Sequence, residues 1–167
     1  MYDPILVPID GSDASDAGLS YALGLASALK ARIVLLNVID VEPLFLQSAG
    51  DFEDHRKSLR AFGQELLATA AVAAQDRGVQ VSYFMRETLE SNAASVIVAE
   101  AAAQHCGLIV LGTHGRRGLS RLLLGSDAER VLRDSSVPVL FVRFPHPDQA
   151  GPQLGAEQSS ACTAAQA

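Results

Sequence analysis

Cysteine, lysine and long apolar runs are scarce in this 167-residue chain. Its two cysteines are Cys106 and Cys162, and the second falls in a stretch with the composition of a tail, so we expect no structural disulfide. The four histidines are scattered, without the spacing of a metal site. No apolar run approaches the ~20 residues that a membrane helix needs, and no basic region followed by an apolar stretch marks a secretory signal. We therefore expect a cytoplasmic protein without a membrane partner.

Several familiar nucleotide-binding and catalytic signatures are missing. The only lysines are Lys30 and Lys57, and no Gly-Lys-Ser/Thr occurs, which excludes a P-loop. No Gly-x-Gly-x-x-Gly follows the first apolar run, which argues against the standard dinucleotide fold. A phosphoacceptor receiver domain would need clustered carboxylates near Asp10 and a lysine after the last strand, and neither is present, which argues against this class. No spacing ties Ser12, Ser126 and His114 into a nucleophile–base relay, so we expect no enzyme, or at most slow ATP hydrolysis.

Charge is unevenly distributed along the chain. The net charge is −6, which argues against a nucleic-acid partner. Residues 112–143 nevertheless carry a local balance of +3, from six arginines against three acidic residues, while the remainder carries −9. Such a cationic region suits a small anionic ligand better than a polyanion. The alternative is a solvated helix face, which we prefer for Arg130 and Arg133.

Short apolar runs alternate with stretches of helical spacing. The runs, at residues 5–9, 33–38, 79–85, 108–111 and 137–143, predict five strands, of which the one at 79–85 alternates in its first half and should have one more exposed face. Helices are predicted at about 12–30, 53–77, 91–104 and from residue 126. Ser12, Ser91 and Ser126 are the predicted caps of the first, third and fourth of these helices. In the long second helix the expected buried face is Leu59, Phe62, Leu66, Ala70 and Ala73, and Gly78 ends it. This alternation predicts a doubly wound parallel α/β sheet.

The stretch from Gly112 to Ser126 is the candidate functional motif. It follows a buried strand and precedes a helix, and glycines at 112, 115 and 118 suit a loop whose N–H groups turn inward. Ser126 and Glu129 fit a capping box at the start of the next helix, where free N–H groups attract anions. We interpret the Gly112–Gly115 turn and the Gly125–Ser126 helix start as two walls of a phosphate cradle. The alternative is a surface loop followed by an ordinary capped helix.

Topology joins this motif to the first strand. Doubly wound sheets bind ligands beyond the carboxyl ends of their strands, where the strand order reverses. If the first and fourth strands flank that point, Asp10 and Gly112 open into one crevice.

Three segments together resemble the universal stress protein family. They are residues 7–12 (Val-Pro-Ile-Asp-Gly-Ser), residues 108–115 (Leu-Ile-Val-Leu-Gly-Thr-His-Gly) and the segment from Gly125-Ser126 to Val142-Arg143. The spacing Gly112, two residues, Gly115, nine residues, Gly125-Ser126 is similar to that family's ATP-binding pattern without a gap. The resemblance covers about residues 3–143.

The resemblance implies an ATP site, with or without Mg²⁺, built from particular residues. Asp10 would hydrogen-bond the ribose hydroxyls, although stabilising the first helix is an alternative role. Pro8 and Ile9 would shape the wall near the base, and Val38 would contact adenine unless it is a plain core residue. The phosphates would be held by Gly112, Gly115, Gly125 and Ser126, with His114, Arg116 and Asp127 as further candidate contacts.

Some positions depart from the family pattern. Asn37 stands where the family often has His, and Cys106-Gly107 where an Asp commonly precedes the fourth strand. Asp127 replaces an apolar residue; its carboxylate suits a helix start but would repel a triphosphate if it pointed inward.

The resemblance also implies an assembly and a role. The last strand, from Val137 to Val142, is apolar and would form a sheet edge, and the family implies a homodimer through it. We expect one domain over residues 1–143, with a Rossmann-like five-stranded sheet of order 3-2-1-4-5 and four helices, and a disordered tail over 144–167. The favoured function is a nucleotide-dependent regulatory or stress-response module with an unidentified protein partner. Weak ATP hydrolysis, or an interaction protein with a vestigial pocket, is the alternative.

Overall fold

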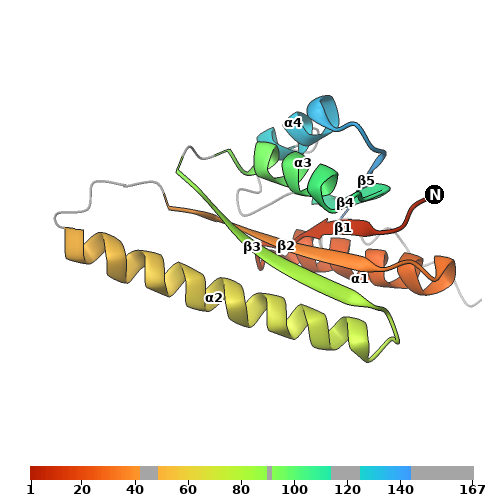
Figure 1. Cartoon of the computed structure of the whole chain (residues 1–167), viewed down its shortest axis with the longest axis horizontal. Helices are drawn as coiled ribbons and strands as arrows, with labels where there is room; N and C mark the ends of the chain where they lie inside the picture. The colour runs from red at the N-terminus through yellow and green to blue at the C-terminus, as the bar shows by residue number, and fades with distance from the viewer. Residues whose placement is uncertain (42–48, 90–91, 114–124, 144–167) are drawn as a thin grey trace, which may run out of the picture.

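The computed structural model describes residues 1–41, 49–89, 92–113 and 125–143, and these form five strands and four helices (Figure 1). In chain order the elements are β1 (Ile5–Pro8), α1 (Asp13–Leu29), β2 (Ile33–Asp40), α2 (Ala49–Gln75), β3 (Val81–Thr88), α3 (Ala93–Ala103), β4 (Leu108–Thr113), α4 (Ser126–Asp134) and β5 (Val139–Arg143). No helix in this described part is long and apolar enough to span a membrane.

All five strands are parallel and lie in the order β3-β2-β1-β4-β5. Strand β1 is central, with Ile5 paired to Ile33 of β2 on one side and to Leu108 of β4 on the other. The predicted doubly wound sheet of order 3-2-1-4-5 with four helices is therefore confirmed.

Helices cover both faces of the sheet: α1 and α2 lie on one face, and α3 and α4 on the other (Figure 1). Successive residues of a strand point to opposite faces, so the apolar runs fill two cores. Ile5, Val7 and Ile9 belong to the core under α1 and α2, and Leu6 to the core under α3 and α4. The near-continuous apolar sequence of the strands is the consequence of this double coverage.

The long helix α2 differs from its predicted form. It spans Ala49–Gln75 rather than residues 53–77, and its buried face is formed by Leu67, Ala70, Ala71 and Ala74. The predicted core position Phe62 is 48% exposed, and Leu66 is only partly buried. Ala70 is buried as predicted, and Leu66 and Ala73 pack partly buried against the core, so Phe62 is the predicted position that departs from the buried face. Deep burial of side chains is confined to the second half of α2.

Capping explains two other helix starts. Ser12 caps α1 as predicted, because its hydroxyl oxygen accepts a hydrogen bond from the Ser15 amide at 3.2 Å. Helix α3 begins at Ala93, and its cap is Asn92 rather than Ser91: the Asn92 side-chain oxygen accepts from the Ser95 amide at 3.2 Å. Ser91 itself lies outside the described residues.

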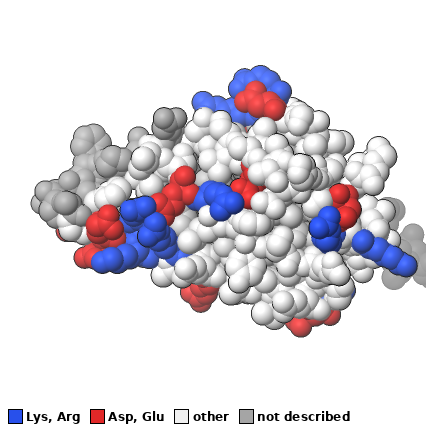
Figure 2. Space-filling model, viewed as in Figure 1, with Lys and Arg blue, Asp and Glu red and all other residues white. Residues whose placement is uncertain are grey.

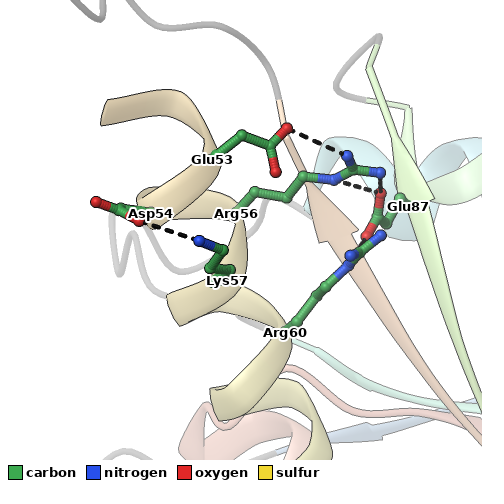
Figure 3. A network of polar contacts seen from close by, with 6 residues as sticks. All are labelled: Glu53, Asp54, Arg56, Lys57, Arg60 and Glu87. Atoms are coloured by element: carbon green, nitrogen blue, oxygen red, sulfur yellow. Dashed lines mark hydrogen bonds and ion pairs between the residues drawn. The ribbon is translucent and has the colours of Figure 1, made fainter. Parts of the chain in front are cut away.

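A charged network attaches the first half of α2 to the sheet (Figure 3). Arg56 and Arg60, one turn apart on α2, both donate to the carboxylate of Glu87 near the end of β3, Arg56 Nη2 at 2.7 Å from Oε2. These hydrogen bonds hold the pKa of the Glu87 carboxyl below its usual value. Figure 2 shows charged side chains gathered over this half of α2 and the neighbouring end of β3. The network therefore fixes the part of the helix that apolar packing does not.

Candidate functional site

The strand order places the candidate site at the sheet's switch point. Strand β1 is followed by α1 on one face, whereas β4 is followed by α4 on the other. Since β1 and β4 are neighbouring parallel strands, their carboxyl ends meet at one edge of the sheet. Asp10 follows β1, and Gly112 lies near the end of β4. The structure thus brings to one edge the two signals that are about a hundred residues apart in the sequence.

Residues 10–15, which we call the Asp10 turn, are held by hydrogen bonds within the turn. The Ser12 amide donates to Asp10 Oδ1 at 2.9 Å, and the Ser15 hydroxyl donates to the Ser12 carbonyl at 3.0 Å. Gly11 between them has φ +76°, which a glycine adopts without strain. Asp10 is exposed, and its Oδ2 has no hydrogen-bond partner among the described residues. One carboxylate oxygen thus shapes the turn, while the other makes no hydrogen bond to the described residues.

Neighbouring elements fix this turn from two sides. The Asn37 side chain of β2, which is buried, donates from Nδ2 to the Ile9 carbonyl at 2.8 Å. Phe62 of α2 lies over Gly11: a Cβ added there would be 3.0 Å from the ring carbon Cζ. The first contact is made at Ile9, the residue before Asp10, and the second at Gly11, the residue after it.

Gly112 is required by packing. A Cβ at this position would lie 1.8 Å from the Ala14 carbonyl oxygen, in the first turn of α1. Gly18, one turn further along α1, is also close, since its Cβ would lie 2.9 Å from the Gly112 amide nitrogen. The backbones of α1 and β4 therefore touch, and this close approach sets the distance between the Asp10 turn and the end of β4.

Helix α4 begins at Ser126 as predicted, but its cap differs from the prediction. Ser126 is its first helical residue, Gly125 is the N-cap with extended backbone (φ −58°, ψ 149°), and no side chain caps the helix. The predicted Ser126–Glu129 capping box is therefore wrong by one residue, because Ser126 already has helical geometry. Glu129 instead donates its amide to the Gly125 carbonyl at 2.9 Å. The leading amides of α4 are left without a side-chain acceptor in the described part of the chain.

Nothing in the described part of the chain crowds the start of α4. A Cβ at Gly125 would meet no atom of the described residues within 4 Å, and Ser126 and Asp127 are exposed. Asp127 adds a negative charge beside amides that themselves favour an anion, so the two effects oppose each other here.

The remaining predicted residues fall into two groups. Pro8 is half-buried at the end of β1, Ile9 belongs to the core under α1 and α2, and Val38 packs partly buried against the opposite core. His114, Gly115 and Arg116 lie outside the described residues. Arg130 and Arg133 are exposed on α4, as expected for a solvated face. In the described ranges no three His, Cys, Asp or Glu side chains are grouped to hold a metal ion.

The sequence did not predict that Asn37 bonds Ile9, just before the Asp10 turn, or that Phe62 covers Gly11 within it. Asn37 interrupts an otherwise apolar strand, and a polar residue in a buried strand needs a partner, so its type was a usable signal. Phe62 gave no such signal, because its spacing on α2 equals that of a core residue.

Comparison with known proteins agrees with this architecture. The family model described as the universal stress protein family matches residues 1–143. A universal stress protein of Methanocaldococcus jannaschii is 38% identical over 146 residues, covering 87% of this chain and 84% of that protein. A solved structure of a universal stress protein family member from Burkholderia pseudomallei is 32% identical with a TM-score of 0.70, over 84% of this chain and 96% of that one.

Two further solved structures share the fold at lower identity. One is a universal stress protein in complex with cAMP, at 24% identity and TM-score 0.61, covering 85% of this chain and 97% of the other. The second is a family protein from Arabidopsis thaliana with AMP bound, at 20% identity and TM-score 0.63, covering 90% of this chain and 96% of the other. From the fold, the switch-point geometry and the family match together, the chain belongs to the universal stress protein family.

Proposed function

We propose that this chain binds an adenine nucleotide at the edge formed by the Asp10 turn, the end of β4 and the start of α4, and that it acts as a nucleotide-dependent regulatory module. The observation that carries the proposal is the placement of Asp10 and Gly112 at adjacent strand ends, where doubly wound sheets bind their ligands.

The ribose end of the site is assigned to Asp10. Its Oδ2, which makes no hydrogen bond to the described residues, is available to accept from a sugar hydroxyl, while Oδ1 keeps the turn in shape through the Ser12 amide. Pro8 and Ile9, at the end of β1, and Val38, near the end of β2, are assigned to the base end, since the parallel pairing of β1 and β2 brings these positions to the same edge of the sheet as Asp10.

The phosphate end is assigned to the start of α4 and to Gly112, near the end of β4. Uncapped amides at a helix start favour an anion, and the space that the described residues leave at Gly125 allows a phosphate to approach the backbone. Gly115, His114 and Arg116 complete the proposed set from the segment that follows β4. Asp127 favours a lower phosphate charge, or a Mg²⁺ ion that offsets it.

Two solved structures with the same fold hold AMP and cAMP, and they support an adenine nucleotide as the proposed ligand class. We retain ATP, with Mg²⁺ as its accompanying ion, as the first candidate, and AMP and cAMP as its competitors. A homodimer through β5 completes the proposed regulatory unit. Four residues of that edge strand are only half-buried in the single chain, which leaves apolar surface for a second copy.

Isothermal titration calorimetry with ATP, AMP and cAMP tests this function. We expect saturable binding of at least one nucleotide, and about tenfold or greater weakening in Asp10→Ala, because a hydrogen bond to a charged group contributes ~1.5–3 kcal/mol. Gly112→Ala is unsuitable as a probe, since the added methyl group would collide with α1. Nucleotide binding that is absent, or unchanged by Asp10→Ala and by Gly125→Val, would contradict the proposal.

A further inference from the structure

Two adjacent residues of the long helix α2, Phe62 and Gly63, lie near the Asp10 turn and near the side chain that holds Ile9. Phe62 lies over Gly11, and Gly63 lies against Asn37: a Cβ at Gly63 would be 2.4 Å from Asn37 Oδ1 and 3.1 Å from the sulfur of Met85. One of them thus contacts the residue after Asp10, and the other contacts Asn37, whose side chain bonds the residue before Asp10. A larger residue at 63 would push the helix away from Asn37, so the contact depends on glycine there.

On the sheet side, β2 holds the peptide that precedes Asp10. The Ile9 amide donates to the Leu36 carbonyl at 2.8 Å, and the Ile9 carbonyl accepts from Asn37 Nδ2 at 2.8 Å. Asn37 is 5% exposed, so its amide group works in a dry environment, where an unpaired polar group is costly. The Ile9–Asp10 junction is therefore fixed in place before the chain reaches Gly11.

On the helix side, Phe62 covers the residue after Asp10. Gly11 has no side chain with which to hold its own conformation, and it packs against the Phe62 ring and, at 3.8 Å from its ideal Cβ, Leu66. Phe62 is nevertheless 48% exposed, so packing against the deep core does not explain its position. The Glu87 network, whose Arg60 lies two residues before Phe62, keeps this part of α2 over the sheet (Figure 3).

We propose that Asn37 and Phe62 are positioning residues for the nucleotide site: they fix Ile9 and Gly11 on either side of Asp10 and so hold its carboxylate where the ligand needs it. This inference rests on the proposed nucleotide-binding function. Neither residue is assigned a contact with the ligand, and each acts through Asp10.

Phe62→Ala tests the positioning role more directly than Asn37→Ala does, because the half-exposed Phe62 side chain can be removed without opening a cavity in the core. Val72→Ala is the matched control, since Val72 is another exposed apolar residue of α2, at 55%. Asn37→Ala accompanies them, with its stability measured separately because this side chain is buried.

The binding test is a double-mutant cycle with ATP, measured by calorimetry on wild type, Phe62→Ala, Asp10→Ala and the double variant. We expect Phe62→Ala to weaken binding roughly threefold to tenfold, the size of couplings between residues in contact, and to add nothing once Asp10 is removed. Val72→Ala should leave the affinity unchanged. An effect that adds fully to that of Asp10→Ala, or no effect of Phe62→Ala on a wild type that binds, overturns the inference and leaves the proposed function intact.

A second readout needs no ligand and separates the two proposals. In the NMR spectrum of the ligand-free protein, the ring of Phe62 should shift the Gly11 Hα resonances, and Phe62→Ala should remove this shift and speed hydrogen exchange at the Ser12 amide. If no nucleotide binds to wild type, the proposed function fails, while this result still shows whether Phe62 holds the turn. Unchanged Gly11 and Ser12 signals in Phe62→Ala would overturn the positioning role whatever binds.

Discussion

Single residues show how much of this fold depends on side chains that occur far apart in the sequence. The carboxylate of Glu87 accepts from both Arg56 and Arg60, whereas Asp54 and Lys57 on the same helix form a fully surface pair with an N–O distance of 3.4 Å (Figure 3). A pair that is partly shielded from water and shared between two donors contributes more than an exposed one. We therefore expect Glu87 to contribute more to the stability of the folded protein than Asp54 does.

Glu87→Gln should lower the free energy of unfolding by about 1 kcal/mol, because the charge-assisted bonds from both arginines are weakened. Asp54→Asn, the matched control, should change it by less than about 0.5 kcal/mol. Because the Arg56 and Arg60 hydrogen bonds lower the folded pKa of Glu87, its stabilisation is fully present above the ordinary value of 4.5 and is lost as the pH falls through the folded pKa. Urea denaturation at pH 7 and pH 3 checks this: a gap between wild type and Glu87→Gln that persists undiminished at pH 3 would contradict the assignment.

Cys106 is a second residue whose behaviour follows from burial. It is 4% exposed, and burial, with a smaller contribution from Glu100, raises the pKa of its thiol to about 11. At pH 8 only about one thiol in a thousand is then ionised, and the thiolate is the reactive form. In a Cys162→Ser variant, the remaining thiol should react with a disulfide reagent only after urea unfolds the protein. Rapid reaction of the folded variant would show that Cys106 is accessible.

At the level of elements, the most demanding contact is that between α1 and β4. Gly112→Ala places a methyl group 1.8 Å from a backbone oxygen, so α1 and β4 must separate, and we expect a loss of about 3 kcal/mol or more. Gly125→Ala meets no atom of the described residues within 4 Å and should cost less than about 1 kcal/mol. Thermal and urea unfolding of the two variants measures the difference. Equal stability would contradict the close approach.

The element boundaries also show what sequence could and could not predict. The five strands, four helices and their order were predictable because apolar runs and helical spacing report burial directly, residue by residue. The caps of α3 and α4 were misassigned because Ser91 and Ser126 are good capping residues next to the true caps, Asn92 and Gly125, although the predicted start of α4 at Ser126 is confirmed. The contact of Phe62 with Gly11 was not predictable, since it depends on how α2 crosses the sheet rather than on any local pattern.

In the whole molecule, the two outer strands of the sheet, β3 and β5, differ in the charged residues that they carry. The outer part of β3 is bordered by the Glu87 network and by Arg86, which donates to Glu100 at 2.7 Å. Strand β5 carries no acid and ends in Arg143, and its residues 139–142 are half-buried. If β5 forms the proposed homodimer, sedimentation at micromolar concentration should give twice the 17.6 kDa of one chain. A monomeric mass under these conditions would contradict the dimer.

The proposed function depends most on two main-chain bends, one predicted after Gly112 and the other at Gly125–Ser126, that bind one phosphate-bearing ligand. The most direct test is an amide-resolved NMR titration with ATP and, separately, AMP. We predict that the amide signals of Gly112, Gly115, Gly125 and Ser126 shift together with one dissociation constant, while Gly78, in the turn between α2 and β3, stays in place. Signals that move at only one of the two bends, or that move with different dissociation constants, would contradict a shared phosphate site.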